Sequence, residues 1–411
     1  MQAIFGLFAF HLIVWLLSEA RNKAPWRLVG SALLLQFALA AVLLHGQIGA
    51  SIFIIASKLM VALQDASTAG TSFVFGYLGG GPTPFQITNP QANFILALQA
   101  LPLIIVISAL SRVLLYWNVL QTVVRLLSGA LERVLGIGGA LSFSALANLF
   151  MGMTESPLLV RPYLQEIDRG EMLALMSTGL ATIAGTVFVL YATILEPAVP
   201  EVAGHLLTAS VISLPAAIAY SCLWVPPGRR TGATVVERNE DESTLDALAK
   251  GANQGVALLI NIVAMLLVMV ATVYLINLCL GSIEIAGQAL SLQRLLGWVL
   301  SPICWLIGIP WVDSVTSGSL MGTKIVLNEL IAYSDLAALP TDTMSERSGV
   351  IMLYALCGFA NFGSMAMLIA GLTLLVPARR ADIIDLAPRA LIIGNLATLA
   401  TGAVAGLVML L

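Results

Sequence analysis

The chain has 411 residues, of which 59% are hydrophobic and only 10% are charged, and its mean hydropathy is +0.96. A soluble globular domain carries roughly 25% charged residues, so this composition excludes an ordinary soluble enzyme and a disordered chain. The formal net charge of −3 supplies no basic face for nucleic acid. The composition therefore predicts a polytopic membrane protein.

Spanning helices need about 20 apolar residues each, and uncharged apolar stretches recur along the whole chain. The first of them is expected to be a retained helix, because Glu19, Arg21 and Lys23 follow it where a signal peptide would have a cleavage site. The stretches are residues 3–18, 28–57, 66–111, 134–154, 172–195, 202–228, 251–283, 295–312, 348–378 and 390–411.

Basic residues predict the orientation, since Lys and Arg are enriched in cytoplasmic loops. Three clusters are expected to be cytoplasmic, which places both termini outside: Arg21, Lys23 and Arg27; Arg229, Arg230, Arg238 and Lys250; and Arg379, Arg380 and Arg389.

Composition also divides the chain. We expect N-terminal scaffold helices in residues 1–90, a first repeat in 91–225, a cytoplasmic linker in 226–250 and a second repeat in 251–411. Within the first part, residues 50–66 carry Lys58 and Asp65 and predict an amphipathic helix at the membrane interface. Residues 73–90 are rich in Gly and Pro and predict an extracellular loop.

Two apolar runs at matching places in the halves are interrupted and lead to an acid. Run 134–154 contains Gly-Gly and precedes Glu155, while run 295–312 contains Ser301-Pro302 and Gly308-Ile309-Pro310 and precedes Glu329. Paired interruptions of this kind are typical of inverted-repeat transporters, whose site lies at the bilayer midplane.

About thirty residues after each acid, small polar residues interrupt a further apolar helix. They are Thr182-Ile183-Ala184-Gly185-Thr186 in the first half and Asn361-Phe362-Gly363-Ser364 in the second. Unwound backbone at membrane depth must be satisfied by protein, water or ligand, so these breaks predict a binding site.

The two acids have simpler interpretations as well. Each could reach the lipid headgroups, and Glu329 could form an internal ion pair with Lys324. A carboxylate at bilayer depth costs at least about 2.5 kcal/mol, which favours a functional pair that binds the hydroxyl groups of a polar solute. Asp313 could position the second hairpin or could be a boundary acid.

Four ordered motifs resemble those of the concentrative nucleoside transporter family, in its bacterial type. Gly152-Met-Thr-Glu-Ser-Pro-Leu-Leu-Val-Arg-Pro-Tyr163 resembles the family signature G-Q-T-E-A-P-L-L-(I/V)-(R/K)-P-Y. The other three are Phe73-Val-Phe-Gly76, Leu320-Met-Gly-Thr-Lys-Ile-Val-Leu-Asn-Glu-Leu330 and Cys357-Gly-Phe-Ala-Asn-Phe-Gly-Ser364. Together the motifs extend over nearly the whole chain.

The resemblance implies an all-α membrane protein with about eight spanning helices, two re-entrant helical hairpins and an interfacial helix. It further implies a homotrimer in the bacterial inner membrane that imports nucleosides with a coupling cation by an elevator-like movement. The residues implied to bind the nucleobase are Gly152, Met153, Thr154, Glu155 and Val187, and those for the ribose are Glu329, Asn361 and Ser364, with Phe359 lining the cavity. The family sodium site maps to Asn148, Met151, Thr182 and Ile183.

Two departures from the family pattern leave the cargo open. Met153 replaces the usual Gln, and Gly363 replaces a common Ser, so both remove hydrogen-bonding groups from the site. The alternative is therefore a modified nucleoside or another polar solute.

The coupling ion is also open. Asn148 and Thr182 keep oxygen ligands that suit sodium, whereas a proton-coupled member would titrate a carboxylate instead. A membrane-embedded enzyme is disfavoured because the dispersed cysteines and histidines form no metal-binding or nucleophile–base pattern. A channel would not need acids in matching broken segments.

Overall fold

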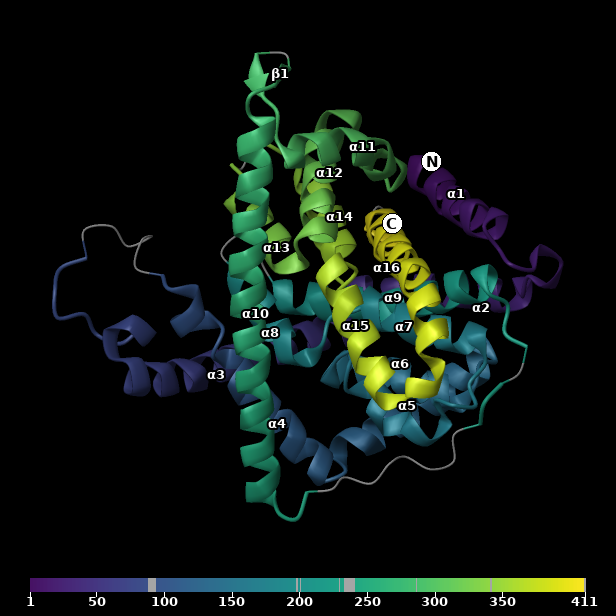
Figure 1. Ribbon diagram of the computed structural model, residues 1–411, viewed down its shortest axis with the longest axis horizontal. Helices are drawn as coiled ribbons and strands as arrows, with labels where there is room; N and C mark the ends of the chain where they lie inside the picture. The colour runs from purple at the N-terminus through teal and green to yellow at the C-terminus, as the bar shows by residue number, and fades with distance from the viewer. Residues whose placement is uncertain are drawn as a thin grey trace.

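The computed structural model describes residues 1–87, 94–196, 199, 201–228, 230–232, 241–285, 287–340 and 342–409, and these ranges are mostly helical (Figure 1). The elements up to the linker are α1 (Gln2–Leu16), η1 (Arg21–Lys23), α2 (Trp26–His45), α3 (Gln47–Phe75), η2 (Gly76–Gly79), η4 (Leu96–Ala100), α4 (Leu103–Tyr116), α5 (Val119–Leu135), α6 (Gly139–Met151), η5 (Ser156–Tyr163), α7 (Arg169–Ala181), α8 (Gly185–Leu195) and α9 (Val202–Trp224). Those after it are α10 (Thr244–Leu280), β1 (Glu284–Ile285), β2 (Gln288–Ala289), α11 (Leu292–Leu306), α12 (Trp311–Val326), α13 (Glu329–Ala338), α14 (Glu346–Leu356), α15 (Phe362–Leu375), η6 (Pro377–Arg379) and α16 (Arg380–Val408).

Within the described residues, seven helical segments are long and apolar enough to cross a membrane, or eight if the bent pair α11–α12 counts as one span. The polytopic membrane protein predicted from composition and the all-α fold implied by the resemblance are both confirmed. The single sheet found in the described ranges is the two-stranded hairpin of β1 and β2, at the end of α10.

The same succession of elements occurs twice. A short helix (α5, then α11) leads into the first arm of a hairpin (α6, then α12), and a break and a shorter second arm (η5, then α13) follow. A broken helix comes next (α7 and α8, then α14 and α15), and a long closing helix ends each repeat (α9, then α16).

The helices that precede the two repeats, α4 and α10, run antiparallel. Gly251 of α10 lies against Ala109 of α4, and Gly255, one turn later, lies against Ile105, one turn earlier. A Cβ on either glycine would approach the α4 backbone to less than 3 Å, so these small residues allow the close packing that replaces hydrophobic burial inside a membrane. The antiparallel pair agrees with the predicted inversion of the repeats.

Burial separates an inner group of helices from the outer ones. In their most apolar stretches the α7–α8 segment and α9 are each 89% buried, whereas α10 is only 6% buried. Small and aliphatic residues from α7, α9, α14 and α16 form the centre of the core. The apolar, uncovered face of α10 therefore suits contact with lipid or with another protein surface.

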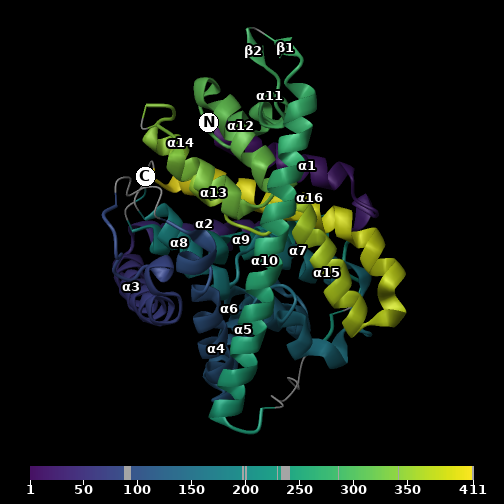
Figure 2. The same ribbon diagram turned by 60° about the vertical axis from the view of Figure 1, so that its left-hand side comes forward.

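Helix α3 lies across the direction of α10 in both Figure 1 and Figure 2. This arrangement fits the interfacial helix predicted for residues 50–66, although α3 is longer and continues to Phe75. Residues 73–79 are thus helical, in α3 and η2, where a loop was predicted, and residues 88–90 of that predicted loop lie outside the described ranges.

The interruption of the run 295–312 is only partly where the sequence predicted it. Helix α11 continues through Pro302, and the chain turns by 118° after Leu306, where Gly308 has φ +106. Prolines are tolerated inside membrane helices, so Ser301-Pro302 does not break this one.

Asp313 of α12, which follows this turn, accepts hydrogen bonds from Ser345 Oγ (2.8 Å) and Ser348 Oγ (2.7 Å). It therefore positions α12 against the start of α14.

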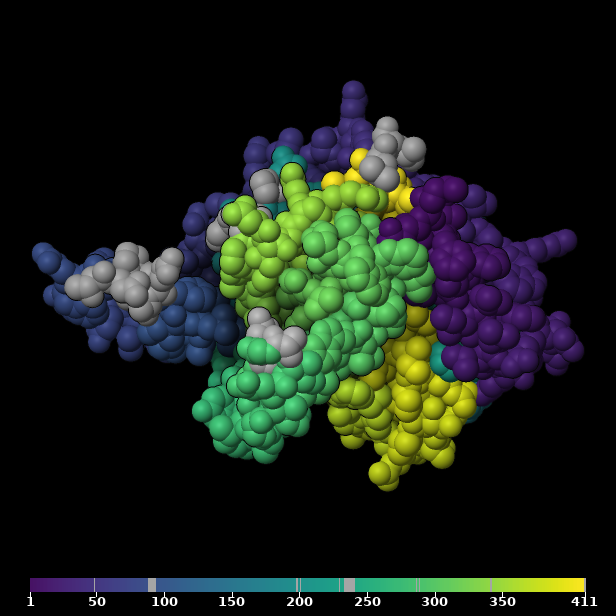
Figure 3. Space-filling model, turned by 90° about the horizontal axis from the view of Figure 1, so that it is seen from above, coloured from purple at the N-terminus to yellow at the C-terminus, as the bar shows by residue number. Residues whose placement is uncertain are grey.

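Ion pairs and a hydrogen bond join the segment after α1 to α7, α9 and α16. Glu19, after α1, pairs with Arg389 of α16 and with Arg169 at the start of α7 (3.2 Å), and its backbone N–H donates to the carbonyl of Trp224 (2.9 Å). Burial would raise the pKa of Glu19, but Arg389 and Arg169 outweigh this effect and hold the pKa below its usual value. Seen from above in Figure 3, the N-terminal helices (purple) lie beside the second repeat (green to yellow).

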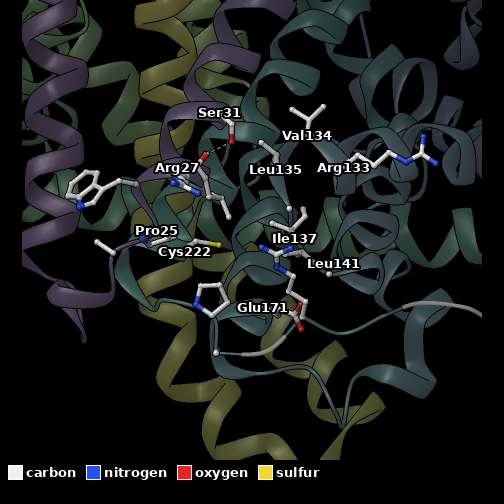
Figure 4. A pocket seen from close by; sticks show the side chains of 18 residues that line it. Pro25, Arg27, Ser31, Arg133, Val134, Leu135, Ile137, Leu141, Glu171 and Cys222 are labelled. Atoms are coloured by element: carbon white, nitrogen blue, oxygen red, sulfur yellow. Dashed lines mark hydrogen bonds between the residues drawn. The ribbon is translucent and has the colours of Figure 1, made fainter.

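A cavity of about 790 Å³ lies between the start of α2, the α5–α6 turn and the segment after α9 (Figure 4). Glu171 on its wall accepts hydrogen bonds from the backbone N–H of Thr231 (3.0 Å) and from its hydroxyl (2.6 Å), which anchors the beginning of the linker to α7. The cavity contains none of the site residues predicted from sequence.

The predicted linker 226–250 is shorter than expected at its C-terminal end, because Thr244–Lys250 already belong to α10.

Candidate functional site

Gly152 forms the tip of the first hairpin. Helix α6 ends at Met151, and Gly152 then adopts φ +107 and ψ 166, a conformation that L side chains rarely reach. A Cβ at this position would lie 3.3 Å from that of Ala184 in the break between α7 and α8. The first tip therefore packs on the first break.

Asn328 starts the second arm of the second hairpin. Its side-chain oxygen accepts a hydrogen bond from the backbone N–H of Ile331 (3.0 Å) and caps α13. Glu329 is the first residue of this helix and is only 4% exposed. Asn361 caps α15 in the same way, accepting from the N–H of Ser364 at 2.7 Å.

The two broken helices cross where they are unwound. The N–H of Phe359, in the break between α14 and α15, donates to the carbonyl of Thr182 at 3.3 Å. A Cβ on Gly358 would lie 2.9 Å from the backbone of Ala181. The backbone of each break thus packs directly against that of the other.

Glu329 lies between the repeats and forms a buried polar cluster. Its Oε2 accepts from the amide of Asn361 at 2.9 Å, and its Oε1 accepts from the hydroxyl of Tyr191, on α8, at 2.5 Å. Asn361 and Ser364 are themselves buried. The three residues assigned to the ribose by resemblance are therefore brought together, and the first repeat supplies a fourth residue, Tyr191.

Glu155 has a different environment. It is half-buried, and its Oε1 accepts a hydrogen bond from Gln254 of α10. Gln254 in turn accepts from Arg112 of α4 at 3.3 Å, and Arg112 forms an ion pair with Asp241 at 2.9 Å. A polar network therefore connects the first hairpin with the α4–α10 pair.

The remaining predicted site residues lie at the first tip and in or beside the two breaks. Met153 is buried against α7, since a Cβ on Gly179 would lie 3.0 Å from that of Met153, whereas Thr154 is exposed beside Gly371 of α15. Val187 is buried in the first turn of α8, and Phe359 is half-buried in the second break.

The predicted sodium ligands gather where α6 ends and α7 unwinds. The amide nitrogen of Asn148 donates to the hydroxyl of Thr182 at 2.5 Å and to the carbonyl of Thr178 at 3.4 Å. The amide oxygen of Asn148 is buried and has no hydrogen-bond partner among the described residues. Met151 ends α6, and Ile183 lies in the break. A spare buried oxygen beside unwound backbone fits a hard cation that prefers oxygen ligands.

Lys324 does not form the ion pair considered from sequence. Its ammonium group donates to the carbonyl of Ala355 (3.1 Å) and to the hydroxyl of Thr398 (2.8 Å), and within the described residues no carboxylate lies within 4.0 Å of it.

Sequence reasoning missed Tyr191 and Gln254. Tyr191 lies in the mainly apolar α8 and Gln254 at the point where the polar start of α10 becomes apolar, and such groups find hydrogen-bond partners when buried. That pattern could have identified both as candidates. Their partners, however, are distant in sequence: Glu329 follows Tyr191 by 138 positions, and Gln254 follows Glu155 by 99.

Comparison with protein families covers most of the chain. Residues 5–78 match the N-terminal model and residues 205–406 the C-terminal model of the Na+ dependent nucleoside transporter, and residues 97–198 match a nucleoside recognition (Gate) domain. The chain belongs to the Na+ dependent (concentrative) nucleoside transporter family. It is a transporter and not an enzyme.

Individual relatives align over nearly their full length. The nucleoside permease NupC of Helicobacter pylori is 32% identical over 98% of this chain and 97% of its own, and the uncharacterized transporter YutK of Bacillus subtilis is 35% identical over 98% of both. The structure of CNTnw in an inward-facing substrate-bound state has a TM-score of 0.91 and 36% identity, covering 99% of this chain and 98% of that one. A CNTnw variant in an outward-facing state has a TM-score of 0.91 and 35% identity, covering 99% and 97%.

Removing the hydroxyl of Tyr191 tests its place in the site. Hydrogen bonds to charged groups contribute about 1.5–3 kcal/mol, so we expect Tyr191→Phe to weaken nucleoside binding by about tenfold or more. Tyr333→Phe is the matched control, because the two rings lie 5.5 Å apart but the Tyr333 hydroxyl donates to the carbonyl of Leu353. Equal effects of the two variants on the dissociation constant of uridine would contradict this role.

Proposed function

We propose that this protein is a symporter that imports nucleosides across the bacterial inner membrane, driven by sodium. The observation that carries this proposal is the buried cluster of Glu329, Asn361 and Tyr191 beside the crossing of the two breaks. It supplies a carboxylate held in one orientation inside an apolar molecule. Membership of the nucleoside transporter family supports the substrate class.

Glu329, Asn361 and Ser364 are proposed to bind the ribose. A carboxylate has about four lone-pair sites, so Glu329 can keep its bonds to Tyr191 and Asn361 and still accept from ribose hydroxyls. Hydrogen bonds to a carboxylate are stronger than neutral ones. A deoxynucleoside would leave a buried acceptor without its donor, which costs about 1–3 kcal/mol.

The base is proposed to lie beside the first hairpin tip, near Gly152, Met153, Thr154, Glu155 and Val187, with Phe359 lining the cavity. Glu155 is the one carboxylate in this group, and Gln254 already donates to it. Met153 contributes apolar contact instead of an amide. We therefore expect these residues to select the nucleobase by its shape more than by its hydrogen-bonding groups.

Sodium is proposed to bind the oxygens of Asn148 and Thr182, with the backbone carbonyls of Met151 and Ile183. The unpartnered oxygen of Asn148 supports this assignment. One cation that enters with the substrate contributes about 2.3 kcal/mol per 100 mV of membrane potential. The alternative is proton coupling through one of the site carboxylates.

The hairpins and broken helices are proposed to move as one body against a scaffold that includes α3, α4 and α10, in an elevator-like manner. The hydrogen bond between Glu155 and Gln254 joins the two bodies and would have to break during the movement. Both termini are proposed to be extracytoplasmic. Homotrimer assembly is proposed as well, since the apolar outer helices leave a large uncovered surface.

Glu329→Gln tests the ribose assignment directly. The variant keeps the shape of the side chain but loses its charge, so uptake of uridine into proteoliposomes should fall by at least about tenfold. Discrimination between uridine and 2′- or 3′-deoxyuridine should shrink along with it. Glu132→Gln, at an exposed position on α5, is the control. Undiminished discrimination in Glu329→Gln would refute the assignment.

Asn148→Leu tests the sodium site. The substitution keeps the branched shape and the number of heavy atoms of the side chain but removes the spare oxygen, so half-maximal uptake should require at least about tenfold more sodium. Ser142→Ala, elsewhere on α6, should leave the sodium requirement unchanged. An identical sodium titration in Asn148→Leu would refute Asn148 as a ligand, whereas uptake that follows only a pH gradient would favour proton coupling.

Met153→Gln tests whether the departure from the family signature sets the preference for the base. Restoring the amide adds a donor and an acceptor for base edges, so competition by a panel of natural and modified nucleosides against labelled uridine should change in rank order. If the nucleosides compete in the same rank order in both proteins, Met153 does not determine the preference for the base.

A further inference from the structure

Lys324 is a buried lysine for which the proposed transport cycle has no role. It lies in the last turn of α12 and its side chain is 0% exposed. An isolated ammonium group in an apolar interior is strongly unfavourable unless it is compensated. The carbonyl of Ala355 and the hydroxyl of Thr398 provide two neutral acceptors.

The carbonyl that binds Lys324 belongs to the end of a helix. Ala355 lies in the last turn of α14, which ends at Leu356 immediately before the second break. The last carbonyls of a helix lack intrahelical donors and carry the negative end of the helix dipole. A positive charge at this position therefore stabilises a helix that has been interrupted inside the molecule.

The first repeat has the same arrangement with a different side chain. The carbonyl of Thr178, in the last turn of α7, accepts from the amide of Asn148, in the last turn of α6. Thr178 precedes the crossing residue Thr182 by four positions, and Ala355 precedes the crossing residue Phe359 by four. Thus Asn148 and Lys324 both reach from the end of a hairpin arm to the end of a broken helix.

The two side chains differ in charge. Asn148 is neutral and keeps a buried oxygen without a partner among the described residues, whereas Lys324 brings its own positive charge. We propose that Lys324 is a tethered cation, which takes at the second break the place that a mobile sodium ion takes at the first. The comparison with sodium rests on the proposed function, while the position of the ammonium group does not.

This assignment has a consequence for coupling. The ammonium group fills the second break permanently, so only the first break is open to a mobile cation. Both breaks then carry one positive charge when the transporter is loaded. We therefore expect one sodium ion for each nucleoside.

Exchanging the tethered cation for an oxygen ligand tests the proposal. Lys324→Asn should open a sodium site between Ala355 and Thr398, in imitation of the first repeat. The readout is the melting temperature of the purified protein in sodium chloride and in N-methylglucamine chloride at equal ionic strength, because an ion that binds the folded state raises this temperature. Lys324→Met, which supplies no oxygen ligand, is the matched control.

Five proteins separate the two sites. Wild type should be stabilised by sodium, Asn148→Leu should lose this shift, and the double variant Asn148→Leu/Lys324→Asn should regain it. The proposal would be overturned if sodium did not raise the melting temperature of the double variant. It would also be overturned if sodium raised the melting temperature of Lys324→Met as much as that of Lys324→Asn. If wild type ignores sodium, the proposed sodium site fails, whereas a shift in Lys324→Asn would still support the tethered cation.

A second measurement holds even if the Lys324 variants do not fold. Sodium activation of uridine uptake by wild-type protein should be hyperbolic, with a Hill coefficient near one, and one charge should move for each nucleoside. Sigmoidal activation with two charges for each nucleoside would contradict the proposal, because a second mobile cation would then be required.

Discussion

The rest of this structure depends on one constraint: backbone that unwinds at membrane depth must find hydrogen-bond partners inside the protein. Two helices unwind here, and each partly satisfies the other, since the N–H of Phe359 donates to the carbonyl of Thr182. The crossing requires close contact between backbones, which the glycine at position 358 allows. The first hairpin tip then packs on the first break, and the second hairpin brings Glu329 to Asn361 beside the second break.

The same constraint explains why polar groups gather where they do. A carboxylate at bilayer depth is costly, and Glu329 is retained with two donors, from Tyr191 and Asn361. The ends of α7 and α14 present carbonyls that favour positive charge. In our account a mobile sodium ion binds near the end of α7, and the ammonium group of Lys324 binds at the end of α14. The site therefore combines the carboxylate of Glu329 with two compensating cations.

The sequence indicated much of this arrangement through local features. Small polar residues within apolar runs correctly predicted interruptions near Thr182 and Asn361, because such residues favour caps and turns over helix interiors. The isolated acids Glu155 and Glu329 marked the hairpin tips for a different reason, the cost of a carboxylate at bilayer depth. The family motifs, and not the local pattern, connected these features with nucleosides.

Long-range pairing could not be predicted in this way. The contact between Tyr191 and Glu329 depends on how two repeats fold against each other, and no local pattern encodes it. Lys324 shows the same limit: its nearness to Glu329 in sequence suggested an ion pair, whereas the structure directs its ammonium group to Ala355 and Thr398. Pro302 would break a soluble helix, yet α11 continues through it.

The central claim is that the two breaks form a single binding unit for nucleoside and cation. Its most direct test is calorimetric titration of uridine with and without sodium, and of sodium with and without uridine. Because coupling free energies are reciprocal, the account predicts that each ligand raises the affinity of the other by the same factor, at least about fivefold. Independent binding of the two, with unchanged dissociation constants, would contradict it.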